Sequence, residues 1–238
     1  MFISADDWGI SPGVNDGILE LAQDGIIRRV SAFAPSAFLN HGLSDLLKVP
    51  DLEIGLHFNL TYNADFSGPG DYLKKWFFLN QAEKEELKAK IKKEFERQFS
   101  ALRSAVPKIE HVDGHQHLHL FPGVWETISP LMKERGIKKT RYAYEFPLWF
   151  SSKAVLNILS LRLKNEITKN FETLPFAYPS EKVFSSTTNL QGYLKRKKGC
   201  EVLVHPAAKM DFEELNIQDG LRERRLLEFH ALKGLRAG

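Results

Sequence analysis

The sequence has little cysteine, no long apolar run and little charge of one sign. Cys200 is the single cysteine among 238 residues, which excludes an internal disulfide framework. No apolar run reaches 18 residues, and the first residues lack the basic segment and long apolar segment of a signal peptide. Lys plus Arg number 33 and Asp plus Glu 30, a weaker and less clustered basic bias than nucleic-acid-binding domains usually show. We therefore expect a cytoplasmic protein with no transmembrane segment and no nucleic-acid partner.

Apolar strand-like segments alternate with amphipathic segments along the whole chain. Runs such as 1–5, 52–60, 109–115, 183–186 and 200–206 read as strands, and 81–105 reads as a long helix with an apolar inner face. This alternation predicts parallel β/α units in one α/β domain spanning residues 1–238, with a strand count near that of a barrel. Residues 61–80 are the exception and read as a long irregular connection, which either lines a site or packs on itself.

Acidic and imidazole side chains gather where the predicted strands end. In parallel β/α folds these ends carry the functional residues. Asp6 and Asp7 end the first strand, His57 lies in 52–60, and His205 ends the last strand. The segment 111–119, HVDGHQHLH, contributes four candidates at the end of its strand: Asp113, His115, His117 and His119. Histidines close to carboxylates are typical of metal sites.

A structural role remains the alternative for each of these residues. Asp6 and Asp7 could cap the next helix, although Ser11 is better placed to do so because Pro12 and Gly13 follow it. His57 alone is typical of a core histidine. His41 and His111 are not grouped with the other candidate residues, and we interpret them as structural or exposed.

Four segments in order resemble one family. ADDWGISPGVNDGI, GLHFNLT, DGHQHLHLFP and VHP are similar to the motifs of the YdjC-like carbohydrate deacetylases, which include the chitooligosaccharide deacetylases. The resemblance covers residues 1 to about 206. It implies a distorted (β/α) TIM-like barrel of mostly parallel strands, related in site logic to the polysaccharide deacetylases. The chain departs from the family pattern at Trp8, Gly114 and Ala207.

The resemblance also implies roles for individual residues. Asp7, His57 and His115 would bind one divalent metal ion, Zn²⁺ or Mg²⁺. Asp6 would act as general base and His205 as general acid. The remaining candidates are residues that would support the metal ligands, namely Asp113, His117 and His119, and aromatic residues that would contact the sugar, namely Trp8 and Tyr62.

The activity implied is metal-dependent hydrolysis of an N-acetyl group on an amino sugar. An acetylated amino-sugar substrate, such as a chitooligosaccharide, is the expected partner, and a homodimer stays open. Two alternatives remain: an amidohydrolase acting on a lipid-linked or other non-chitin amide, and a non-catalytic sugar-binding protein on the same scaffold. A phosphoesterase is disfavoured because the sequence offers neither a phosphate-binding glycine loop nor bridging carboxylates for a second metal.

Overall fold

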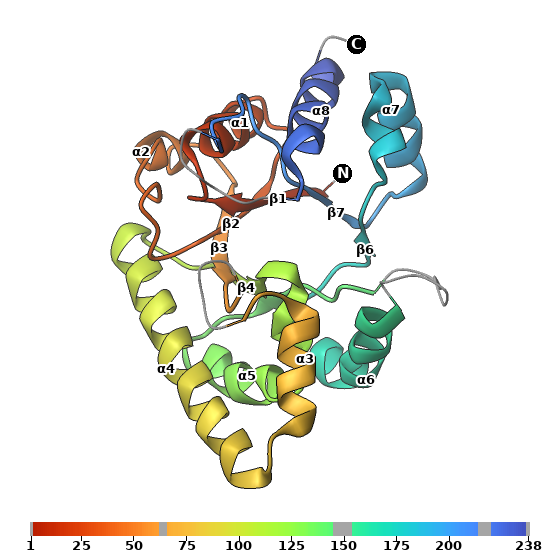
Figure 1. Ribbon diagram of the computed structural model, residues 1–238. Coiled ribbons are helices and arrows are strands. Elements are labelled where there is room, and N and C mark those ends of the chain that lie inside the picture. The colour runs from red at the N-terminus through yellow and green to blue at the C-terminus, as the bar shows by residue number, and fades with distance from the viewer. Residues whose placement is uncertain (1, 62–65, 145–153, 214–219, 237–238) are drawn as a thin grey trace. The chain divides into compact units, whose positions relative to one another are not determined.

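The computed structural model describes residues 2–61, 66–144, 154–213 and 220–236 (Figure 1). The chain forms two compact units. The first comprises Met1–Ile54 with Leu174–Gly238, and the second comprises Gly55–Thr173. Each unit is described by itself below.

The first unit holds most of the parallel strands together with helices from both ends of the chain. Strand β1 pairs in parallel with β2 on one side and β7 on the other, and β7 pairs with β6. Helices α1 and α8 lie side by side over β1 and β7 (Figure 1). The elements are β1 Phe2–Trp8, α1 Pro12–Gln23, β2 Arg29–Ala32, α2 Leu43–Leu46, β6 Phe176–Ala177, η2 Glu181–Ser185, α7 Thr187–Arg196, β7 Glu201–Val204, α8 Arg222–Lys233 and η3 Gly234–Arg236.

The second unit packs helices around a shorter parallel set. Strand β3 begins in the first unit, where the amide of Glu53 donates to the carbonyl of Arg28, and continues into the second to pair with β4. Strand β4 pairs in turn with β5. The elements are β3 Glu53–Phe58, α3 Pro69–Phe78, α4 Gln81–Ala105, β4 His111–Gly114, η1 His115–Leu120, α5 Val124–Glu134, β5 Lys139–Thr140 and α6 Ala154–Asn170.

The strand order is β5-β4-β3-β2-β1-β7-β6 in a seven-stranded sheet. Every pairing given above is parallel, which confirms the α/β class. Among the described residues the order has two ends, β5 and β6, so the strand order differs from that of the closed eight-stranded TIM form.

Two segments differ from the sequence interpretation. Residues 183–186 are not a strand, because a 3₁₀ helix covers Glu181–Ser185 and the strand lies earlier, at Phe176–Ala177. The connection 61–80 contains a helix, α3, which begins with Pro69 at its first turn. A proline at that position loses no intrahelical hydrogen bond and already has a helical φ, a signal present in the sequence.

The turn after β1 is fixed by short-range polar contacts. Ser11 caps α1 by accepting from the amide of Val14 at 3.2 Å, as expected, and Pro12 opens the helix. Asn15 on that helix accepts from the amide of Gly9 at 2.6 Å and donates to the carbonyls of Phe38 and His41. These bonds hold the backbone that immediately follows the two aspartates.

Candidate metal and acid–base site

A buried chain of polar contacts runs through the second unit. Nδ1 of His57 lies 2.7 Å from Oδ1 of Asp113, and Oδ2 of Asp113 lies 2.9 Å from a terminal nitrogen of Arg141. All three side chains are at most 2% exposed. Burial acts to raise the pKa of Asp113, but the guanidinium of Arg141 and the imidazole of His57 outweigh it and hold that pKa well below its usual value. The carboxylate therefore stays ionised and fixes the orientation of His57.

Two imidazoles then face each other at the end of β3 and β4. Because Nδ1 of His57 donates to Asp113, its Nε2 presents a lone pair, and Nδ1 of His115 lies 3.4 Å from that atom. The rings meet nearly at right angles, with 81° between their planes. Two nitrogens bound to one tetrahedral ion at about 2.0–2.1 Å stand about 3.3–3.4 Å apart, so this pair has the spacing of two metal ligands.

The backbone after β4 has an uncommon conformation that places these histidines. Gln116 and His117 have φ of 52° and 58°, in the left-handed region. Gly114 has no room for a side chain, since a Cβ there would lie 2.7 Å from the backbone nitrogen of His119. The glycine that departs from the family pattern is thus what this chain requires for a close approach of η1 to β4.

His117 and His119 have different surroundings. His119 is fully buried, its Nε2 lies 3.0 Å from the carbonyl oxygen of Arg141, and burial lowers its pKa to about 4. Burial also lowers the pKa of His117 well below the usual value, with the charge of Arg141 acting in the same direction. Both rings are therefore held neutral, and the contacts of His119 are those of a structural residue.

In the first unit, the two aspartates fall on an irregularity of β1. The pairing register of β1 with β2 shifts between Ala5 and Trp8, and Asp7 has a φ of 73°. Such irregularities re-aim side chains, and positive φ at a non-glycine residue is concentrated at functional sites. Both carboxylates are buried, Asp6 2% and Asp7 1% exposed.

Asp7 has a charged partner that the motifs do not contain. A terminal nitrogen of Arg225, on α8, lies 2.6 Å from Oδ2 of Asp7, and both side chains are 1% exposed. A buried carboxylate is costly unless a positive charge compensates it. Arg225 supplies that charge from a helix at the other end of the sequence.

His205 follows β7 and is fastened by its backbone to the same helix. Its amide donates to Oε2 of Glu228, and its carbonyl accepts from Arg225 at 3.4 Å. The ring meets Tyr178 edge to face, with 5.7 Å between ring centroids. The residue is partly exposed while its backbone is held.

Comparison with known proteins identifies the family. A family model described as YdjC-like protein matches residues 1–237. The chain belongs to the YdjC-like family. Similar relatives include a protein of Citrobacter koseri, 28% identical over 193 residues that span 78% of this chain and 68% of that protein. A Klebsiella pneumoniae protein is 31% identical over 147 residues, which are 58% of this chain and 57% of that protein. Both relatives are named chitooligosaccharide deacetylase.

A solved structure supports the fold of this YdjC-like chain. It is that of an Enterococcus faecalis protein named as a candidate for cellobiose-phosphate cleavage, with a TM-score of 0.68 and 21% identity. The match covers 97% of this chain and 89% of that one. Among the described residues, no helix has both the length and the apolar character needed to cross a membrane.

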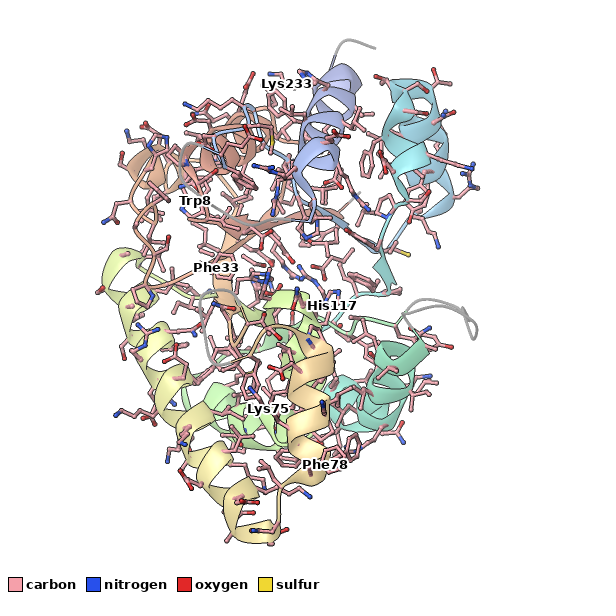
Figure 2. The ribbon with its side chains drawn as sticks, in the orientation of Figure 1. Trp8, Phe33, Lys75, Phe78, His117 and Lys233 are labelled. Atoms are coloured by element: carbon pink, nitrogen blue, oxygen red, sulfur yellow. The ribbon has the colours of Figure 1, made fainter. Side chains whose placement is uncertain are left out.

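The two aromatic residues expected at the sugar have different outcomes. Trp8 is fully buried and its Nε1 donates to the carbonyl of Leu39 at 2.9 Å, which are the contacts of a core residue (Figure 2). The expectation that it stacks on a sugar is therefore not supported. Tyr62 lies outside the described residues.

The YdjC-like motifs point to the strand-end residues but not to their charged partners. Arg141, Arg225 and Glu228 are buried around the candidate residues, and none of them lies in a segment with a recognisable pattern. Each is far in sequence from the residue that it contacts: 28, 218 and 23 positions, respectively. The signal that the sequence offers is the charge on the segment that forms α8, Arg222–Lys233, and only the structure shows that Arg225 and Glu228 on it are buried.

Proposed function

We propose that this YdjC-like chain is a metal-dependent carbohydrate deacetylase. It would remove an N-acetyl group from an amino-sugar substrate resembling a chitooligosaccharide. The observation that carries the metal site is the pair of facing imidazole nitrogens, His57 and His115, with His57 oriented by Asp113. The substrate class rests on the relatives, whose names describe them as chitooligosaccharide deacetylases.

The donor set fits a divalent ion. Asp7, His57 and His115 offer one carboxylate oxygen and two imidazole nitrogens, a combination suited to Zn²⁺. Mg²⁺ prefers oxygen ligands, so Zn²⁺ is the first metal to test and Mg²⁺ the second. A bound divalent ion lowers the pKa of water and polarises the acetyl carbonyl oxygen.

Two side chains of the first unit would move the protons. Asp6 would accept a proton from the attacking water as the new C–O bond forms at the acetyl carbon. His205 would donate a proton to the leaving nitrogen as the C–N bond breaks, giving acetate and a free amine. His205 suits this role because it follows β7 at a partly exposed position with its backbone held by α8.

The test is acetate release from N-acetylglucosamine oligomers, with chelator and with added Zn²⁺ or Mg²⁺. We expect release that chelator abolishes and metal restores. Asp6→Asn should keep metal affinity and lose most turnover, whereas His115→Ala should lose both.

His205→Gln should lower turnover by about 10²–10⁴-fold, the usual contribution of a general acid. His230→Gln is its matched control, since His230 is an exposed histidine on α8. Near-full turnover of Asp6→Asn would refute the base assignment. Absence of release by a metal-loaded protein would move the search to other amides, lipid-linked ones included.

A further inference from the structure

Helix α8 reaches both candidate residues that end β1 and β7. On this helix, one terminal nitrogen of Arg225 donates to Oδ2 of Asp7 at 2.6 Å, and the other donates to the carbonyl oxygen of His205 at 3.4 Å. The backbone carbonyl of Arg225 also accepts from the amide of Ala207 at 3.2 Å. A single residue therefore contacts the carboxylate after one strand and the backbone after its parallel neighbour.

We propose that Arg225 is a positioning residue. It occupies Oδ2 of Asp7, so that Asp7 presents its other oxygen to the metal, and it keeps the backbone of His205 in place beside β1. This inference rests on the proposed function, because it assigns a role to Arg225 within that site.

The planar fork of arginine explains why this residue type stands here. Two terminal nitrogens diverge from one carbon, so the side chain can place one on a carboxylate and the other on a carbonyl, whereas a lysine has a single nitrogen for both acceptors. The guanidinium group also lies over an aromatic ring, with its central carbon 5.5 Å from the centre of Phe212. A carboxylate held on one oxygen by a rigid partner cannot turn both oxygens towards another ligand.

A second buried residue on α8 makes the attachment of His205 stronger. Glu228 is fully buried, accepts from the amide of His205 and accepts from Nε of Arg224 at 2.6 Å. The chain has alanine at 207, where the family pattern has glycine, so the turn after His205 cannot rely on glycine geometry. Polar contacts from α8 hold this turn instead.

The test compares Arg225→Met, which keeps the apolar stem and removes the fork, with Arg225→Lys, which keeps the charge. Arg222→Met is the matched control, because Arg222 starts the same helix, is 43% exposed and pairs only loosely with Glu213 at 3.4 Å in the described chain. Zn²⁺ affinity is measured by chelator competition. The visible absorption of the Co²⁺-loaded protein reports the number of ligands. Circular dichroism confirms that each variant folds.

We expect Arg225→Met to lose about 10–100-fold in Zn²⁺ affinity, as removal of a ligand's supporting partner usually does, and to change its Co²⁺ spectrum. Arg222→Met should match the wild type in both. Arg225→Lys should keep the wild-type Co²⁺ spectrum but lower kcat with KM unchanged, since one ammonium nitrogen at Asp7 leaves the position of the second guanidinium nitrogen, at the His205 carbonyl, unfilled. A merely structural arginine would alter stability and leave the spectrum unchanged.

A folded Arg225→Met with wild-type affinity and spectrum overturns the inference. If Arg225→Met does not fold, Arg225→Lys decides, and a wild-type kcat in that variant overturns it. Wild-type protein that binds neither Zn²⁺ nor Co²⁺ overturns the proposed function and this inference with it. Wild-type binding and acetate release, together with unaffected Arg225 variants, overturn this inference alone.

Discussion

Asp113→Asn should weaken both the fold and the metal site. The substitution removes the carboxylate charge 2.9 Å from Arg141, which is 1% exposed, and removing one partner of a buried ion pair costs about 3–5 kcal/mol. It also replaces the carboxylate 2.7 Å from Nδ1 of His57 with a neutral amide. Loss of such a partner typically reduces metal affinity about 10–100-fold, or about 1.4–2.8 kcal/mol.

A double variant separates the two effects. Asp113→Leu with Arg141→Met replaces the buried pair by apolar side chains, which is often close to neutral for stability. We expect the double variant to recover most of the lost free energy of unfolding while its metal affinity remains low. The assays are urea unfolding of the metal-free protein and chelator competition with Zn²⁺. A loss below about 1 kcal/mol in Asp113→Asn would refute the buried-charge reasoning. Unchanged Zn²⁺ affinity would refute the orienting role of Asp113.

Three further variants test the packing in each unit. Arg29→Met removes the cation 3.1 Å from fully buried Glu201 and should cost about 3–5 kcal/mol in urea unfolding, whereas a loss under about 1 kcal/mol would contradict this. The pKa of His119 is about 4 in the folded state and about 6.5 in the unfolded state. Above pH 6.5 the ring is neutral in both states. As the pH falls towards 4 the unfolded state takes up a proton first, so the free energy of unfolding decreases by about 3 kcal/mol. His119→Gln should flatten that pH dependence of stability, and an unchanged slope would count against it. Gly123→Ala places a Cβ 2.3 Å from the Trp76 ring at a φ of 78°. We expect the free energy of unfolding to fall by about 1–3 kcal/mol and the tryptophan fluorescence to change. Unchanged stability and fluorescence would contradict this close contact.

Local patterns predicted much of the fold. The long helix 81–105 has the bounds that its charge and apolar periodicity indicate. Asn80 and Glu83 form a capping box at its N-terminus. Ser11 caps α1 where the sequence placed the cap. The short strands were harder, because Phe176–Ala177 and Lys139–Thr140 are only two residues long and carry no alternation to detect.

The candidate site was predictable only in part, for a related reason. The ends of the longer strands can be located in the sequence, so His57 and the 111–119 cluster could be placed at strand ends before the structure was known. The structure brings His57, Asp113 and His115 together. Trp8 could not be assigned, because an aromatic residue after two aspartates looks the same whether its ring faces solvent or packs in a core. Its hydrogen bond to Leu39 depends on a turn 31 residues away.

In each unit a buried arginine compensates the charge of a buried aspartate. In one, Asp113 lies between His57 and Arg141, and in the other, Asp7 is paired with Arg225. Both arginines are 1% exposed, so each was removed from water together with its carboxylate. Burying a carboxylate alone would favour its protonation, and a protonated aspartate is a poor metal ligand and cannot hold an imidazole in one orientation. Arg141 helps to hold Asp113 ionised and Arg225 compensates the buried charge of Asp7, so charged residues outside every motif support the candidate residues within each unit.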